Sequence, residues 1–79
     1  MQVQFEFYGV LQALCSATPA AVDAEGTVAD ALLRLGEQYP LAQRELQRAA
    51  CAVGDRIVLR STPLSDGLTV ALLPPVAGG

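Results

Sequence analysis

Histidine is absent from this 79-residue sequence. Because histidine is the commonest general base and the commonest metal ligand, its absence removes the usual basis of acid–base catalysis and of a metal centre. Only two cysteines are present, and Cys15 and Cys51 lie far apart, with no CxxC or similar ligand spacing around either. On its own, the chain is therefore not expected to be an enzyme or to bind a metal.

Positive charge is also scarce. Five basic residues stand against eight acidic ones, for a net charge of −3, and they are too few and too scattered to follow a phosphate backbone. No apolar run approaches the ~18 residues that cross a membrane, and the first residues lack the features of a secretion signal. We therefore expect a cytoplasmic protein that binds neither nucleic acid nor membrane. Its two cysteines should be reduced and mostly buried, with a single disulfide between them as the alternative.

Apolar residues, by contrast, make up 52% of the sequence. They predict an ordered core with apolar surface left over for a partner. Near the start, Val3, Phe5 and Phe7 alternate with polar residues, which is the period of a half-buried strand. Near the end, the run Leu68–Leu73 follows an Asp66-Gly67 turn and is the strongest strand candidate. As the most apolar strands, these two should lie side by side at the centre of a sheet.

One helix is expected between them. Thr27 is a candidate N-cap, with Asp30 three positions later as a weaker form of the capping box. Pro40 ends the helix, because proline disfavours helical geometry at the residue before it. Apolar residues recur along one helical face: Val28, Leu32, Leu35 and Tyr39.

The remaining segments are shorter. Within the stretch Cys15–Ala24, a weak strand is expected, which Pro19 would confine to a sheet edge. Residues 41–48 form a short helical turn or a loop, and two short strands, Ala50–Val53 and Arg56–Leu59, flank a tight turn. This order predicts an α+β fold over residues 1–75, with a mixed sheet of about five strands packed on one main helix. It is the β-grasp (ubiquitin-like) arrangement.

The last residues read Pro74-Pro75-Val76-Ala77-Gly78-Gly79. The prolines have no N–H to continue a sheet ladder and favour an extended course. Small residues and two glycines then follow, and a glycine lacks the Cβ that would block entry into a narrow channel. We therefore predict that residues 76–79 are a flexible functional tail, which carries the carboxylate of Gly79 into the active site of another protein.

Such a carboxylate needs activation before it can react. Adenylation by ATP would give an acyl-adenylate, and a sulfur nucleophile could then displace AMP to leave a C-terminal thiocarboxylate. The sequence contains neither a GxxxxGK[ST] nor a GxGxxG nucleotide-binding motif. The adenylate would therefore form on a partner enzyme, and the chain itself is expected to bind no cofactor.

Several segments resemble the small subunit of molybdopterin synthase, a family of ubiquitin-like sulfur carriers. The ending Asp66–Gly79 carries the most specific resemblance. The aromatic first strand Phe5-Glu6-Phe7-Tyr8-Gly9, the helix opening Thr27-Val28-Ala29-Asp30-Ala31-Leu32 and the run Ala50-Cys51-Ala52-Val53 also match the family's pattern.

The resemblance implies a role for each of the two terminal glycines. In that family the terminal glycine is adenylated by an E1-like enzyme and converted to a thiocarboxylate, with sulfur from a donor such as a cysteine desulfurase or a rhodanese-type protein. The carrier inserts its tail into the large subunit of molybdopterin synthase and donates sulfur to cyclic pyranopterin monophosphate, which builds the dithiolene of the molybdenum cofactor. Gly79 would thus bear the sulfur, and Gly78 would allow close approach.

A docking patch for the partner is predicted on the sheet face away from the helix, where the strand periodicity places Tyr8 and Leu73. The alternative is a set of scattered exposed apolar residues, which are ordinary on protein surfaces. The predicted partner-binding residues of the patch and tail are Tyr8, Ile57, Leu73, Pro74, Pro75, Val76 and Ala77.

Other residues are expected to have structural roles. Neither cysteine has the setting that lowers a thiol pKa, so both are interpreted as core residues. The arginines at 44, 48, 56 and 60 are expected to form a solvated face. Three other functions stay open: a sulfur carrier for thiamine thiazole or another thiolated product, a ubiquitin-like modifier of lysines, and a plain interaction module.

Overall fold

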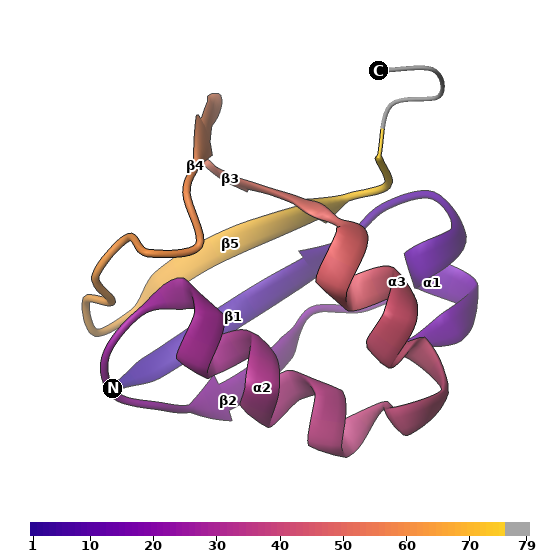
Figure 1. Cartoon of the computed structure of the whole chain (residues 1–79), viewed down its shortest axis with the longest axis horizontal. Helices are drawn as coiled ribbons and strands as arrows, with labels where there is room; N and C mark the ends of the chain where they lie inside the picture. Colours follow the sequence, from indigo (N-terminus) through magenta and orange to yellow (C-terminus); the bar gives the residue numbers. More distant parts are fainter. Residues whose placement is uncertain (76–79) are drawn as a thin grey trace.

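A computed structural model of the chain describes residues 1–75. Five strands form one sheet, and the helices lie at one of its faces and along one end (Figure 1). In chain order the elements are β1 (Gln2–Phe7), α1 (Val10–Leu14), β2 (Ala20–Asp23), α2 (Val28–Gln38), the 3-10 helix η1 (Pro40–Ala42), α3 (Gln43–Arg48), β3 (Ala50–Val53), β4 (Arg56–Val58) and β5 (Leu68–Leu73).

The sheet has the order β2-β1-β5-β3-β4. The predicted pairing of the first and last strands is confirmed: β1 and β5 lie side by side and run parallel, while the other neighbours are antiparallel. β2 begins directly after Pro19 and is an edge strand, as the proline predicts. The last strand is therefore internal, with β1 on one side of it and β3 on the other.

The covered face of the sheet holds the core. Val3, Phe5, Val70 and Leu72 have no exposed surface, and the helix α2 lays its predicted apolar stripe across them. At the end of that stripe, Tyr39 meets Phe7 edge to face, with ring centroids 5.8 Å apart.

Helix α2 begins as predicted, with a complete capping box. The Asp30 N–H donates to the Thr27 hydroxyl, and the Thr27 N–H donates to the Asp30 carboxylate at 2.8 Å. These bonds satisfy donors that a helix start otherwise leaves unpaired. The bond from the Thr27 N–H lowers the pKa of Asp30, and so, to a smaller extent, does the Thr27 hydroxyl, which donates to the same carboxylate at 3.0 Å.

Two features differ from the sequence expectations, and a third decides between two predicted alternatives. No element was predicted for residues 10–14, where a five-residue helix, α1, buries Leu11. Residues 41–48, predicted as a short helical turn or a loop, are helical, as η1 and α3. β4 ends at Val58, one residue earlier than predicted, and the exposed Leu59 follows it. In residues 1–75, no helix is long and apolar enough to cross a membrane.

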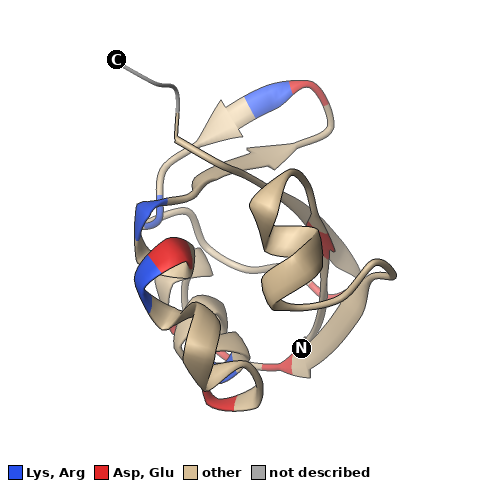
Figure 2. Cartoon of the chain, turned by 90° about the vertical axis from the view of Figure 1, so that its right-hand side faces the viewer, with Lys and Arg blue, Asp and Glu red and all other residues tan. Residues whose placement is uncertain are grey.

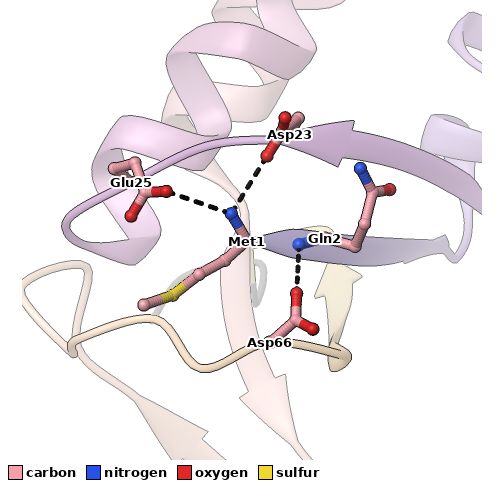
Figure 3. Close-up of polar contacts among 5 residues, drawn as sticks. All are labelled: Met1, Gln2, Asp23, Glu25 and Asp66. Atoms are coloured by element: carbon pink, nitrogen blue, oxygen red, sulfur yellow. Dashed lines mark hydrogen bonds and ion pairs between the residues drawn. The ribbon is translucent and has the colours of Figure 1, made fainter.

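Polar contacts hold the start of β1 (Figure 3). The Met1 amino group lies 3.0 Å from a carboxylate oxygen of Asp23 and 3.2 Å from one of Glu25. The Gln2 N–H donates to the Asp66 carboxylate at 2.7 Å. The hydrogen bond to Asp23, followed by that to Glu25, raises the pKa of the Met1 amine. These contacts tie β1 to β2 on one side and to the turn before β5 on the other.

Candidate functional site

The candidate site is built on the end of β5. Because β5 runs parallel to β1, its last residue lies at the end of the sheet remote from Met1 (Figure 1). Beyond Leu73 the chain leaves the sheet, and Pro74 and Pro75 are exposed. The predicted tail residues Val76, Ala77, Gly78 and Gly79 lie outside the described residues.

Both neighbouring strands hold this end of β5. On one side, the Tyr8 N–H donates to the Leu72 carbonyl at 3.2 Å, which extends the β1–β5 ladder by one residue. On the other side, Leu73 pairs with Ala50 of β3. The base of the tail is therefore part of the rigid sheet, and the chain leaves it from a fixed point.

The open face of the sheet has a different character from the covered face. One row across it runs Glu6, Ala71, Ala52 and Ile57, one residue from each of β1, β5, β3 and β4. Ile57 is 68% exposed, whereas Ala52 is only 6% exposed and stands outside the core cluster. The short side chains in the middle of the row therefore project little from the sheet, and the larger side chain of Ile57 lies at the edge of this area.

Next to this row, the predicted patch residues gather where β1 and β5 end. Tyr8 is 43% exposed, and its hydroxyl donates to Glu6 at 3.4 Å on the same face. Leu73 is half-buried, and Pro74 and Pro75 follow it in the chain. Ile57 lies apart from them, across the width of β3. The structure thus brings Tyr8, Leu73 and the prolines to one end of the open face and places Ile57 further along it.

Charged side chains are sparse around the tail's base. Helix α1, which flanks it, has the sequence Val-Leu-Gln-Ala-Leu and carries no charge, as Figure 2 shows in the uncoloured helix beside the end of β5. Val10 of this helix is 51% exposed. Sequence reasoning missed Val10, because its exposure follows from a helix too short to leave a periodic pattern.

The two cysteines are free thiols away from this end of the open face. Cys51 is buried on the covered face and Cys15 is half-buried. Burial raises the pKa of the Cys15 thiol. Burial also raises the pKa of the Cys51 thiol, and the charge of Arg60 offsets part of that rise. A raised pKa disfavours the reactive thiolate, so neither cysteine is set up as a nucleophile.

Arg60 corrects one expectation. Arg44, Arg48 and Arg56 are exposed, but Arg60 is half-buried and is not part of a solvated face. Its guanidinium donates to the carbonyls of Leu46, Gln47 and Ala49 at 2.7–2.9 Å, at the C-terminal end of α3. It thereby pairs carbonyl groups that the helix end leaves free. Within residues 1–75, no three potential metal ligands from His, Cys, Asp or Glu gather together.

The parallel central strands, the helix across one face and the internal last strand define a class: the ubiquitin-like β-grasp proteins. The fold matches that of small archaeal modifier protein 1 from Haloferax volcanii, with a TM-score of 0.79 and 22% identity over the whole of both chains. Residues 7–79 match the model of the ThiS family, and the chain belongs to that family.

Two relatives bear on the role of the chain. It is 33% identical to the molybdopterin synthase sulfur carrier subunit of Mycobacterium tuberculosis, over 100% of this chain and 99% of that protein. It also matches a chain of the Helicobacter pylori complex of subunits 1 and 2 of molybdopterin-converting factor, with a TM-score of 0.70 and 29% identity over all of both chains. The family resemblance inferred from the sequence is thereby confirmed.

Proposed function

We propose that this chain is the sulfur carrier subunit of a molybdopterin synthase. The carboxylate of Gly79 is adenylated with ATP on an E1-like enzyme, with release of pyrophosphate. Sulfide, or a persulfide on the donor protein, then displaces AMP, and the C–S bond replaces the C–O bond to the phosphate. With a persulfide, a thiol next cleaves the S–S bond of the acyl disulfide, which releases the thiocarboxylate and leaves a disulfide on the donor. The resulting thiocarboxylate donates its sulfur to cyclic pyranopterin monophosphate in the large subunit.

The observation that carries this proposal is the internal position of β5. An internal last strand, paired on both sides, presents the following residues from a rigid base at an exposed end of the molecule where charged side chains are sparse. The sequence continues from that base with two prolines and ends in two glycines. The relative from Mycobacterium tuberculosis is named as a molybdopterin synthase sulfur carrier subunit, and the Helicobacter pylori structure is a complex of subunits 1 and 2 of molybdopterin-converting factor.

The open face supports the proposal because it offers a surface for the large subunit. Tyr8, Leu73 and the exposed prolines lie at the base of the tail, and Ile57 extends the apolar surface along the sheet. A few well-packed residues near the centre of a contact, with tyrosine among the commonest, supply most of the binding energy in protein complexes. A partner that covers this face would bury the exit of the tail within the interface.

The direct test follows the mass of the intact chain. The protein is incubated with an E1-like enzyme, ATP and a sulfur source, and exchange of one oxygen for sulfur at the C-terminus is expected. A chain lacking Gly79, and one extended by a single alanine after it, serve as matched controls and should stay unchanged. Unaltered mass of the wild-type chain, or equal conversion of the controls, would refute the proposal.

A ubiquitin-like modifier uses the same fold and the same activated carboxylate, so the same experiment addresses it. The sequence contains no lysine, so the chain offers no lysine of its own for attachment, and isopeptide adducts would report partner proteins alone. Such adducts would favour the modifier, whereas sulfur exchange favours the carrier. A pull-down with the molybdopterin synthase large subunit then separates this pathway from a carrier for thiamine thiazole.

A further inference from the structure

The turn after β1 places a glycine against the first residue beyond β5. Gly9 has φ of 61° and ψ of −137°, and the Leu11 N–H donates to the Tyr8 carbonyl at 3.3 Å across it. These angles are those of the first central residue of a type II′ turn, a conformation that favours glycine. A Cβ at Gly9 would lie 2.9 Å from Cγ and 3.4 Å from Cδ of Pro74. The proline ring therefore occupies the space that a side chain at position 9 would need.

This contact comes at the point where the sheet stops guiding the chain. Leu73 still pairs with Ala50 of β3, but Pro74 has no N–H to donate to a neighbouring strand. From there on, the contact between the Pro74 ring and the turn constrains the course of the chain. The lack of a side chain at Gly9 is what allows the ring to lie so close.

We propose that Gly9 is a positioning residue for the tail: the bare turn seats Pro74 and so sets the direction in which the chain leaves the sheet. This inference rests on the proposed function of the tail. When a partner's channel holds them extended, the five residues that follow Pro74 reach up to ~16 Å, so a tilt of ~10° at their base displaces the far end by ~3 Å. A misplacement of ~1 Å at a reacting group can already slow a reaction ~100-fold.

The molecule contains a matched control for the strain at Gly9. Gly54 has φ of 63° in the two-residue turn between β3 and β4, and within residues 1–75 no residue other than glycine has a positive φ, so this turn is also of type II′. A Cβ at Gly54 meets nothing within 4 Å. Gly54→Ala therefore introduces the backbone strain alone, whereas Gly9→Ala introduces the strain together with the collision with Pro74.

The experiment compares the two variants as substrates of the E1-like enzyme and sulfur source. Both should melt at a lower temperature than the wild type. The kcat/KM of thiocarboxylate formation should fall about tenfold or more in Gly9→Ala and stay within about twofold of the wild type in Gly54→Ala. Adding Pro74→Ala removes Cγ and Cδ and leaves only Cβ, 3.8 Å from the new methyl group. Because this second change removes the same contact that Gly9→Ala disrupts, it should cause little further loss in the Gly9→Ala background, whereas it should slow conversion about tenfold in the wild-type and Gly54→Ala backgrounds.

Each outcome decides the matter. Equal conversion of Gly9→Ala and Gly54→Ala overturns the positioning role while normal conversion of the wild type leaves the proposed function standing. Losses in Gly9→Ala and Pro74→Ala that multiply in the double variant also overturn it, because the two residues would then act separately. A wild-type chain that gains no sulfur overturns both. If Gly9→Ala does not fold, Pro74→Ala alone replaces it: loss of the ring should then slow conversion about tenfold, and unchanged conversion overturns the inference.

Discussion

The two faces of the sheet are made from the same strands and differ in almost every other respect. On the covered face, Phe5 and Leu72 have no exposed surface and pack beneath α2. On the open face, the middle of the sheet carries Ala52 and Ala71, and larger apolar groups stand at its margins, such as Ile57. Neighbouring residues of one strand therefore have different roles: one packs in the core and the next belongs to the open face.

The difference shows how a domain of this size combines stability with a binding surface. A small domain buries a modest fraction of its surface, so it needs nearly all of one sheet face for its core. The other face can then be apolar only where a partner covers it, and small side chains there limit the exposed apolar area. The covered face should consequently govern folding, and the open face should govern binding.

Phe5→Ala should have the largest effect on folding. Removal of a fully buried phenylalanine costs about 3–5 kcal/mol, a large part of the roughly 4–12 kcal/mol expected for a domain of this length. Unfolding in urea, followed by circular dichroism, measures the loss. Ile57→Ala, on the open face, is the matched control and should change the free energy of unfolding by less than about 1 kcal/mol. Similar losses in the two variants would contradict the division between the faces.

Leu73→Asp should have the opposite pattern, with a large effect on binding and a small effect on folding. A charge at the base of the tail would be buried without a partner in the proposed interface, which should weaken binding of the large subunit about 100-fold, or by roughly 3 kcal/mol. The half-buried position should limit the loss of folding stability to about 1 kcal/mol. Titration calorimetry with the large subunit measures the binding.

The matched control for this variant is Thr69→Asp, which places the same charge on the open face of the same strand, far from the tail's base. Its effect on binding should be much smaller. If Leu73→Asp binds as tightly as the wild type, the docking patch is refuted.

Thr27→Ala should have an intermediate effect, and on folding alone. The hydroxyl of Thr27 accepts from the Asp30 N–H at the start of α2, the helix that covers the core. Loss of an N-cap costs about 1 kcal/mol, and binding of the large subunit should not change, because the helix lies across the sheet from the open face. Ser65→Ala is the control, since the Ser65 hydroxyl makes no hydrogen bond within residues 1–75. A change in the binding of the large subunit by the Thr27 variant would contradict the division of roles between the two faces.

Local patterns in the sequence predicted most of this arrangement. The alternation of Val3, Phe5 and Phe7, the stripe of α2 and the cap at Thr27 each depend on residues close together in the chain, and each was confirmed. The central pairing of β1 and β5 followed from their apolar composition. The local patterns did not predict α1, because a five-residue helix with one buried side chain leaves no periodic pattern to detect.

Contacts between distant segments were beyond such reasoning. Arg60 looks like a surface arginine in the sequence, and its three carbonyl acceptors become visible only once α3 ends beside it. In the sequence, Gly9 is only the last residue of the segment that contains the first strand. Its position against Pro74 depends on the parallel pairing of β1, which precedes Gly9, with β5, which precedes Pro74. The predicted docking residues were correctly expected to be apolar, but their spacing across the sheet required the strand register.

The smallest effect is expected at the start of β1, which belongs to neither face. In the folded chain, the hydrogen bonds to Asp23 and then to Glu25 raise the pKa of the Met1 amine above its ordinary value of about 8. The folded state therefore keeps this proton to higher pH than the unfolded state does. The stability that the contacts contribute is fully present below about pH 8 and is lost as the pH rises through the folded-state pKa.

The comparison of urea unfolding at ~pH 7 and ~pH 10 measures this loss. The sequence has neither histidine nor lysine, so few other groups titrate in this range. The cysteines, whose pKa values burial raises, contribute with the same sign but equally in wild type and variant. Asp23→Asn with Glu25→Gln should flatten the decline in stability and leave binding of the large subunit unchanged at ~pH 7, because these carboxylates lie at the end of the sheet remote from the tail. An equally steep decline in the variant would mean that the Met1 contacts contribute nothing to folding.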